Sequence, residues 1–199
     1  MMDLDMTHDI QRVYRKLLNC MSRPGLIENI SSESQKVDIT IDMIKHLLTI
    51  LFTVLYGEVT FHLPALKDSE LIKKLNHLTY AKNAIVQQAD YIIVTKGATQ
   101  SELLAAFGQA KVGTLMDPQN SATLILEVKA INGGQQLALS GPGIEHKNYV
   151  DVTGSFDWIG IRTEKNIEFP LGVDMMIVDE TGNIICLPRT TQIVHQEVQ

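Results

Sequence analysis

The sequence predicts an α/β fold in which helices flank a central mixed β-sheet. Residues 91–94 form a continuous apolar run rich in β-branched side chains, as expected of an interior strand covered on both faces. Amphipathic helical patterns accompany this run, for example over residues 10–21. Residues 124–139 and 173–187 each hold two apolar runs around a glycine-containing turn, which predicts two β-hairpins. Interior strands are typical of parallel sheets and hairpins are antiparallel, so we expect a mixed sheet.

The N-terminal segment predicts one helix, a turn and a short strand. Apolar residues recur at steps of three and four from Ile10 to Met21, and Thr7 is placed to cap this helix. The Pro-Gly pair that follows disfavours further helix and predicts a turn. Residues 26–30 are then expected to form a short strand, and the polar residues 31–35 a loop.

A second helix is predicted over residues 41–56, with Thr40 as its N-cap and Gly57 as its terminator. This helix is apolar nearly all round, which indicates either a central helix or one that contributes to a subunit interface. His46 lies among its leucines and is expected to be a satisfied core or interface histidine.

The middle of the chain predicts further strands and helices in alternation. Strict alternation over residues 58–63 indicates a strand, and Asp68 is placed to cap the helix that follows. After the strand at residues 91–94, residues 99–102 match a capping box that begins another helix. Residues 156–165 are a further candidate helix.

Length and composition fit one folded domain, residues 1–199. The chain is 45% hydrophobic and 20% charged, values typical of globular proteins without extensive disorder. Its net charge is −6 and it has no basic run, which argues against nucleic acid as a partner. A small anion would need local arginine or backbone N–H donors.

The sequence indicates a cytoplasmic protein without a membrane segment. Its longest apolar run, residues 47–56, is too short to span a bilayer. Residues 1–9 carry three aspartates and no Lys or Arg, unlike a signal peptide. Cys20 and Cys186 are too few to staple a secreted scaffold, and both lie in apolar contexts, so we expect two core thiols in a reducing compartment.

Motifs for bound metals and cofactors are weak. The six histidines form no HxH or HxxxH pair, and neither cysteine has a partner at metal-ligand spacing, so we expect neither a metal nor a cofactor. Residues 95–99 join a strand to a helix N-terminus, where N–H groups favour phosphate, but they lack the spacing of known phosphate-binding loops. Most connections of this kind are structural.

Two arginines beside prolines are candidate anion contacts. Arg23 and Arg189 each adjoin a proline that stiffens the backbone, and hydroxyl residues lie next to both. A rigid bidentate donor of this kind suits a carboxylate or a phosphate. A structural ion pair with Asp174 or Glu168 would suit Arg189 equally well.

Residues 140–144, Ser-Gly-Pro-Gly-Ile, follow a predicted strand. Their glycines could aim consecutive N–H groups at an anion, although spacing alone favours a sharp turn. The candidate anion or partner contacts are therefore Ser22, Arg23, Gly141, Gly143, Asp174, Arg189 and Thr190. No nucleophile motif or catalytic carboxylate pair accompanies them.

Four motifs, in this order, resemble one family: MSRPG at residues 21–25, SGPGI at 140–144, FPLGVD at 169–174 and LPRTT at 187–191. The family is PhnH, the H subunit of the carbon–phosphorus lyase system. Stretches around residues 57–61 and 113–124 are also similar to it. The departures from the family pattern are Tyr56 in place of Asp, Gln119 in place of Glu and Ser121 in place of Gly.

The resemblance implies a three-layer α/β/α sandwich with a central mixed sheet, similar to the large domain of pyridoxal-phosphate-dependent transferases but without the cofactor site. It implies a core complex with G-, I- and J-type subunits that makes ribose 1-phosphonate 5-triphosphate from ATP and an alkylphosphonate. Carbon–phosphorus bond cleavage would belong to the J subunit. The H subunit would serve as a structural partner without an active site, and would form a homodimer in isolation.

Two alternatives remain open at this point. One is an autonomous pyridoxal-phosphate transferase with Lys96 or Lys82 as its Schiff-base lysine. The other is a small-anion or nucleotide-binding protein built on Arg23 and Arg189.

Overall fold

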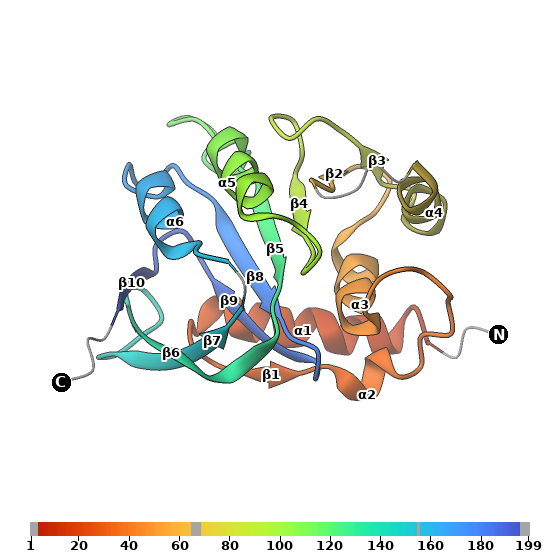
Figure 1. The fold of residues 1–199 in the computed structure, drawn as a ribbon, viewed down its shortest axis with the longest axis horizontal. Helices are drawn as coiled ribbons and strands as arrows, with labels where there is room; N and C mark the ends of the chain where they lie inside the picture. The colour runs from red at the N-terminus through yellow and green to blue at the C-terminus, as the bar shows by residue number, and fades with distance from the viewer. Residues whose placement is uncertain (1–3, 65–68, 155, 196–199) are drawn as a thin grey trace.

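A computed structural model describes residues 4–64, 69–154 and 156–195 and centres on a seven-stranded sheet of order β1-β9-β8-β5-β4-β2-β3 (Figure 1). The five strands from β3 to β8 in this order run parallel, whereas β9 is antiparallel to both of its neighbours, so the predicted mixed sheet is confirmed. The strands are β1 (Glu28–Asn29), β2 (Thr60–His62), β3 (Lys82–Asn83), β4 (Tyr91–Val94), β5 (Thr123–Glu127), β8 (Asp174–Val178) and β9 (Asn183–Leu187).

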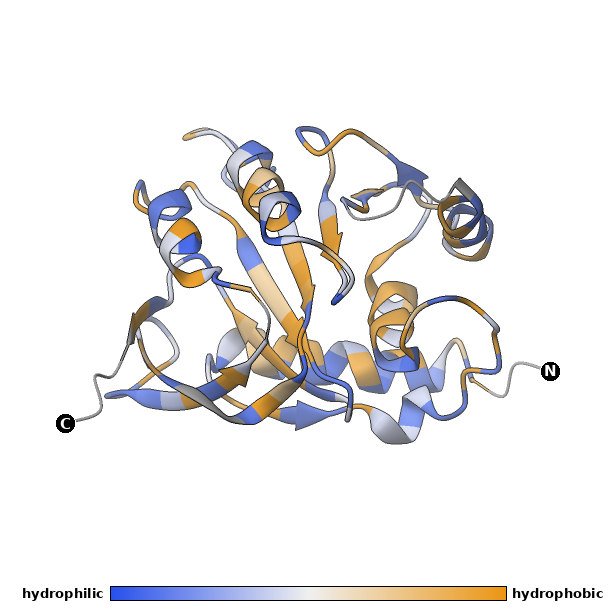
Figure 2. Ribbon diagram, viewed as in Figure 1, coloured by the Kyte–Doolittle hydropathy of each residue, from blue (hydrophilic) through white to orange (hydrophobic). Residues whose placement is uncertain are grey.

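Helices cover both faces of this sheet. In β4, Ile93 faces the core formed with α1, α3 and α4, whereas Ile92 faces the core formed with α5 and α6. Figure 2 shows the resulting concentration of hydrophobic residues in the central strands. The helices are α1 (His8–Ser22), α2 (Ser31–Ser34), α3 (Lys45–Val54), α4 (Ser69–Thr79), α5 (Gln100–Gln109) and α6 (Ile159–Lys165). The predicted interior strand over residues 91–94 is therefore confirmed.

A second, three-stranded antiparallel sheet of order β10-β6-β7 packs against the core of α5 and α6. Its strands are β6 (Ala130–Ser140), β7 (Asn148–Thr153) and β10 (Gln192–His195). The hairpin predicted over residues 124–139 is wrong, because β5 and β6 belong to different sheets. Ile125 is buried as fully as Leu124, so β5 is covered on both faces and pairs with β4 and β8 instead. The predicted turn, residues 132–134, lies where the register of β6 against β7 shifts.

The second predicted hairpin is confirmed. Strands β8 and β9 pair antiparallel, with Met176 opposite Cys186. The buried Asp179 carboxylate organises their turn by accepting hydrogen bonds from the N–H groups of Thr181 and Asn183. Its other oxygen accepts from the N–H of Ile131 at 3.0 Å, so the same carboxylate ties the hairpin to the start of β6.

The N-terminal predictions hold only in part. Helix α1 forms as expected, but the Asp5 carboxylate, rather than the predicted Thr7 side chain, accepts from the first free N–H groups. The strand predicted over residues 26–30 is reduced to β1. The loop predicted over residues 31–35 is wrong: α2 forms there, because Asn29 Oδ1 accepts from the Ser31 N–H at its start.

Helix α3 begins four residues later than predicted, since Ile44 is extended and Thr40 caps nothing. The β-branched residues 39–41 disfavour an earlier start. Seven of its ten residues are buried within the chain itself. The central-helix option is therefore confirmed, and the interface option is wrong, because this apolar surface is already covered.

The remaining local predictions fare better. The capping box is confirmed: Thr99 accepts from the Glu102 N–H while the Glu102 carboxylate accepts from the Thr99 N–H. The Asp68 cap lies outside the described residues. Cys20 and Cys186 are fully buried free thiols, as predicted. In the described part of the chain, no helix combines the length and hydrophobicity needed to cross a membrane.

Candidate functional site

Three turns that lie far apart in the sequence meet in the structure. They are residues 22–25 after α1, residues 140–144 after β6 and residues 187–191 after β9. The middle turn touches both of the others, and we call the three together the turn cluster. It contains most of the predicted contact residues, namely Ser22, Arg23, Gly141, Gly143, Arg189 and Thr190; the remaining one, Asp174, binds Arg189.

Two glycines make this close approach possible. Gly141 has φ +126°, and a Cβ atom there would lie 2.7 Å from the Thr190 carbonyl oxygen. Gly143 has φ +84°, and a Cβ atom would collide with the Ser22 carbonyl oxygen. Both the backbone conformation and the lack of space require glycine. Ile144 closes the turn by donating its N–H to the Gly141 carbonyl at 3.1 Å, which agrees with the sharp-turn interpretation.

Arg189 is fully occupied by internal hydrogen bonds. Its Nη2 donates to Asp174 Oδ2 at 2.6 Å and to Ser121 Oγ, and its Nε donates to Asp174 Oδ1. Its Nη1 donates to the carbonyls of Pro118 and Pro170. Every side-chain nitrogen of Arg189 therefore has a partner. The structure selects the ion pair with Asp174 over the one with Glu168.

A second arginine, Arg162, also binds the turn at residues 187–191, although its sequence pattern did not mark it as a candidate. Arg162, on α6, is 1% exposed and donates to the carbonyls of Leu187, Pro188 and Thr191. Burial lowers its pKa to about 10, against the opposing effect of Asp174, so the guanidinium stays charged at neutral pH. Its position among Trp158, Ile159 and Ile161 in the sequence was the available signal.

Arg23 is the predicted candidate that remains available. It is exposed, and its guanidinium makes no hydrogen bond or ion pair with the described residues. It lines a cavity of about 390 Å³ between the first two turns of the turn cluster, together with Glu145 and Tyr149. The neighbouring Ser22 hydroxyl is used internally, because it donates to the Asn19 carbonyl. Arg23 could therefore contact an anion or a partner without breaking an existing bond.

A larger cavity, of about 470 Å³, lies at the carboxyl ends of β4 and β5, where open α/β sheets commonly bind ligands. Glu127 lines it, is 3% exposed and accepts from the Lys96 N–H through one oxygen. Its other oxygen has no partner within the described residues. Burial raises the pKa of Glu127. The Lys96 ammonium forms an ion pair with Glu180 at 2.9 Å, which raises the pKa of Lys96.

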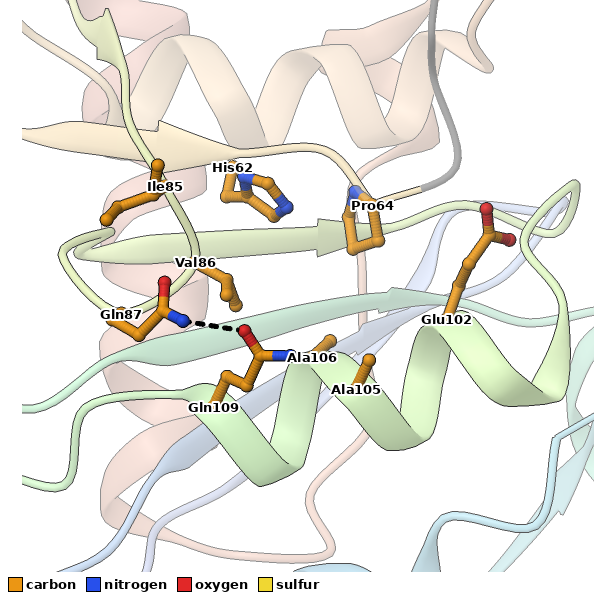
Figure 3. A pocket seen from close by; sticks show the side chains of 9 residues that line it. All are labelled: His62, Pro64, Ile85, Val86, Gln87, Glu102, Ala105, Ala106 and Gln109. Atoms are coloured by element: carbon orange, nitrogen blue, oxygen red, sulfur yellow. Dashed lines mark hydrogen bonds between the residues drawn. The ribbon is translucent and has the colours of Figure 1, made fainter.

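Figure 3 shows a third cavity, of about 360 Å³, between α5 and the segment that follows β3. His62, Ile85 and Gln87 line one side, and Ala105 and Gln109 of α5 line the other. Its polar groups have partners within the chain: Gln87 donates to Gln109 at 2.7 Å, and His62 Nδ1 lies 2.8 Å from the Ala84 carbonyl oxygen. The lining offers no nucleophile with an adjacent base.

Within the described ranges, no three His, Cys, Asp or Glu side chains gather closely enough to hold a metal ion. Arg189 and Arg162 both bind backbone carbonyl groups, and Arg189 also binds the Asp174 carboxylate. These contacts hold the backbone of residues 187–191 in place.

A family model of bacterial phosphonate metabolism proteins, PhnH, matches residues 3–194. The chain belongs to the PhnH family. It is 30% identical over 186 residues to HtxG of Stutzerimonas stutzeri, a protein named as a C-P lyase subunit. The matched region covers 92% of this chain and 85% of HtxG. The chain is 28% identical over 192 residues to the alpha-D-ribose 1-methylphosphonate 5-triphosphate synthase subunit PhnH of Rhizobium meliloti. That match covers 95% of this chain and 92% of the relative.

The three positions expected to depart from the PhnH pattern are Ser121, Gln119 and Tyr56. The Ser121 hydroxyl accepts a hydrogen bond from Arg189. Gln119 is exposed and donates to Asp117, and Tyr56 is half exposed. Ser121 therefore helps to hold the Arg189 guanidinium beside Asp174.

Proposed function

We propose that this chain is an H-type subunit of a carbon–phosphorus lyase core complex, required there for making ribose 1-phosphonate 5-triphosphate from ATP and an alkylphosphonate. One observation carries its structural role: Arg189 and the glycines of residues 140–144, which belong to the family motifs, make internal contacts. Arg189 binds Asp174 and backbone carbonyls, and the glycines of residues 140–144 admit neighbouring carbonyl groups. The motifs thus shape a surface, and the chemistry belongs to other subunits.

We propose G-, I- and J-type subunits as its partners, and pairing with a second copy when it is isolated. The names of HtxG and of the Rhizobium meliloti relative, each called a subunit, support an assembly. The two free thiols support a reducing cytoplasm as the compartment. We also propose that the whole chain acts as one domain, similar in fold to the large domain of pyridoxal-phosphate-dependent transferases. The parallel strands β2, β4, β5 and β8 between helical layers support this likeness.

An autonomous pyridoxal-phosphate transferase fits the structure less well. A Schiff-base lysine must lose its proton near neutral pH, which burial or a nearby cation promotes. Lys96 instead is exposed and paired with Glu180, so its pKa is raised. Lys82 is exposed on the two-residue edge strand β3.

Small-anion binding is the second candidate, and the free guanidinium of Arg23 beside its cavity favours it. Calorimetry with ATP and with methylphosphonate tests this candidate. Heat of binding that disappears in Arg23→Ala would support it, and no heat with the wild-type chain would remove it.

Co-expression tests the first proposal. The chain carries an affinity tag and is produced with the G-, I- and J-type subunits of its own organism. We expect all of them to elute together at a fixed ratio on size exclusion. Elution of the other subunits as a complete, active complex without this chain would contradict the proposal.

A further inference from the structure

The cavity of about 470 Å³ at the carboxyl ends of β4 and β5 holds a buried carboxyl group with an unpaired oxygen. Glu127 lines this cavity and is 3% exposed. Its Oε2 accepts from the Lys96 N–H at 3.2 Å, whereas its Oε1 has no partner within the described residues and is shielded from bulk water. A buried carboxyl oxygen without a hydrogen bond is costly, so this position favours a ligand that supplies a donor.

The same cavity lies at the N-terminus of a helix that has no side-chain cap. Residues 41–44 line the cavity and lead into α3, whose N-cap residue, Ile44, offers no side-chain acceptor. The N–H groups of residues 45–47 have no acceptor in the part of the chain that the structure describes, and the first turn contains no acidic side chain. These N–H groups point back along the helix axis toward residues 41–44. They offer hydrogen-bond donors, and the positive end of the helix dipole, to an anionic group.

The charged side chains around the cavity select neither a simple anion nor a simple cation. Lys96 and Glu180 neutralise each other across 2.9 Å. Asp42 lines the cavity and is exposed, and Lys45, of opposite charge, is exposed three residues later in the first turn of α3. The cavity therefore has two poles: the unpaired oxygen of Glu127, which accepts, and the free N–H groups of α3, which donate.

The other titratable groups on the adjoining elements leave these two poles unchanged. Burial lowers the pKa of His46, in the first turn of α3, so its imidazole is neutral at pH 7. The Asp179 carboxylate already accepts hydrogen bonds from Ile131 and from its own turn. Lys129, which follows β5, is exposed and lies outside the cavity lining. A ligand that satisfies both poles therefore carries a donor at one end and an anionic acceptor at the other.

We propose that this cavity binds a short zwitterion, whose ammonium group donates to Glu127 and whose anionic group accepts from the N–H groups at the start of α3. An ammonium group is a strong donor to a carboxylate. Ile41 and Met43 line the cavity and offer apolar contact to the carbon chain between the two charges. The Thr95 hydroxyl, which also lines it, has no partner among the described residues and can make a further hydrogen bond.

The size of the cavity agrees with a small-molecule ligand, since such sites span about 300–1,000 Å³. A metal ion is a poorer occupant, because no three His, Cys, Asp or Glu side chains of the described ranges gather there. The site stands on its own contacts. Only the choice of an aminoalkylphosphonate as the first probe rests on the proposed function.

Isothermal titration calorimetry of the full chain tests the proposal with matched probes. The zwitterions are 2-aminoethylphosphonate and β-alanine, and the probes that carry only one of the two charges are ethylphosphonate and ethylamine.

Three variants accompany the wild-type chain, and circular dichroism melts establish that each one folds. Glu127→Gln removes the accepting carboxylate. Ile44→Ser places a side-chain cap at a residue whose extended backbone suits one, so that the serine competes with the ligand for the N–H groups of α3. Glu58→Gln is the control, because Glu58 is an exposed carboxylate without a polar contact to the described residues.

We expect a zwitterion to bind wild type at least about tenfold more tightly than ethylphosphonate or ethylamine, since each of these lacks one charge-assisted hydrogen bond. Glu127→Gln should weaken binding of the zwitterion about tenfold or more, and Ile44→Ser about threefold or more, while Glu58→Gln binds like wild type. Tighter binding of 2-aminoethylphosphonate than of β-alanine would assign the site to phosphonates, and the reverse order would assign it to amino acids. Both orders support a zwitterion site.

Any of three results would overturn the inference: no heat from either zwitterion with wild type, ethylphosphonate binding as tightly as 2-aminoethylphosphonate, or unchanged binding in both Glu127→Gln and Ile44→Ser. Each of them would leave the proposed function standing, because co-expression tests the subunit role without a ligand. Absence of this chain from the co-expressed complex would in turn overturn the proposed function and leave the calorimetric test of the cavity intact.

Discussion

Replacement of Arg189 by methionine removes the side chain that joins Asp174 to the backbone at Pro118 and Pro170. Methionine keeps most of the aliphatic volume but donates no hydrogen bonds. The Asp174 carboxylate loses its cationic partner, and the carbonyls of Pro118 and Pro170 lose a donor. The side chains of Arg189 and Asp174 are only 15% and 23% exposed, so water replaces these bonds incompletely.

The size of the effect follows from that exposure. Breaking a fully buried ion pair costs about 3–5 kcal/mol, and partial solvent access to Asp174 places this pair at the lower end, about 3 kcal/mol. For a domain of this size, that corresponds to a fall in Tm of about 6–12 °C. Adding Asp174→Asn to the variant should cost less than it does in wild type, because it removes a carboxylate that has already lost its partner.

Urea unfolding followed by circular dichroism measures these free energies. Arg15→Met is the matched control, because Arg15 is exposed on α1 and has no polar contact with the described residues, so its variant should stay within about 0.5 kcal/mol of wild type. The reasoning about Arg189 is refuted if Arg189→Met is equally mild. Strict additivity with Asp174→Asn would also refute the ion pair.

Three further predictions concern single side chains. Gly143→Ala should destabilise the fold by about 2 kcal/mol or more, because the residue has a positive φ and a Cβ atom would collide with the Ser22 carbonyl oxygen. Gly160→Ala is the control: its Cβ would enter open space on α6, and it should stabilise the fold by up to about 1 kcal/mol. Thermal melts of both variants measure these changes. Burial opposes ionisation of Asp179, but hydrogen bonds from Ile131 and its own turn outweigh it and lower the pKa. The stabilisation by Asp179 is therefore present above the unfolded pKa of about 3.9 and is lost as pH falls through the folded pKa. Below about pH 5, the free energy of unfolding in urea should fall with pH less steeply in Asp179→Asn than in wild type. Burial raises the pKa of Glu127, so the free energy of unfolding of wild type should fall as pH rises from about 4.3 through the folded pKa. Glu127→Gln should not show this fall. A difference in unfolding free energy between the two chains that stays constant across this pH range would count against the prediction.

Local signals predicted the parts of the fold that depend on adjacent residues. The capping box of α5 and the β8–β9 hairpin are both set within a few positions, and both form as expected. The hairpin predicted over residues 124–139 failed because tertiary burial decides the partner of β5. Its apparent outward residue, Ile125, faces the core of α1 and α3. Alternation in a single segment cannot distinguish a half-exposed strand from one covered by helices on both faces.

The residues of the turn cluster were recognisable as candidates from the sequence, but the contacts between them were not, and their role as anion or partner contacts stays a prediction. The glycines at 141 and 143 and Arg189 were recognisable as unusual, because each adjoins a proline in the sequence. That Gly143 meets Ser22, more than a hundred residues earlier, depends on how β6 and α1 are placed by the core. Arg162 and Glu127 gave weaker signals, since burial of a charged residue depends on carbonyls or cavities supplied by distant segments.

The most direct test of the central claim is phosphorus NMR of ATP and methylphosphonate incubated with the purified chain alone, and with the G-, I- and J-type subunits in its presence and absence. We expect ribose 1-methylphosphonate 5-triphosphate to form at the full rate only when this chain completes the complex, and no product from the chain alone. Product from the chain alone, or an undiminished rate without it, would contradict the account.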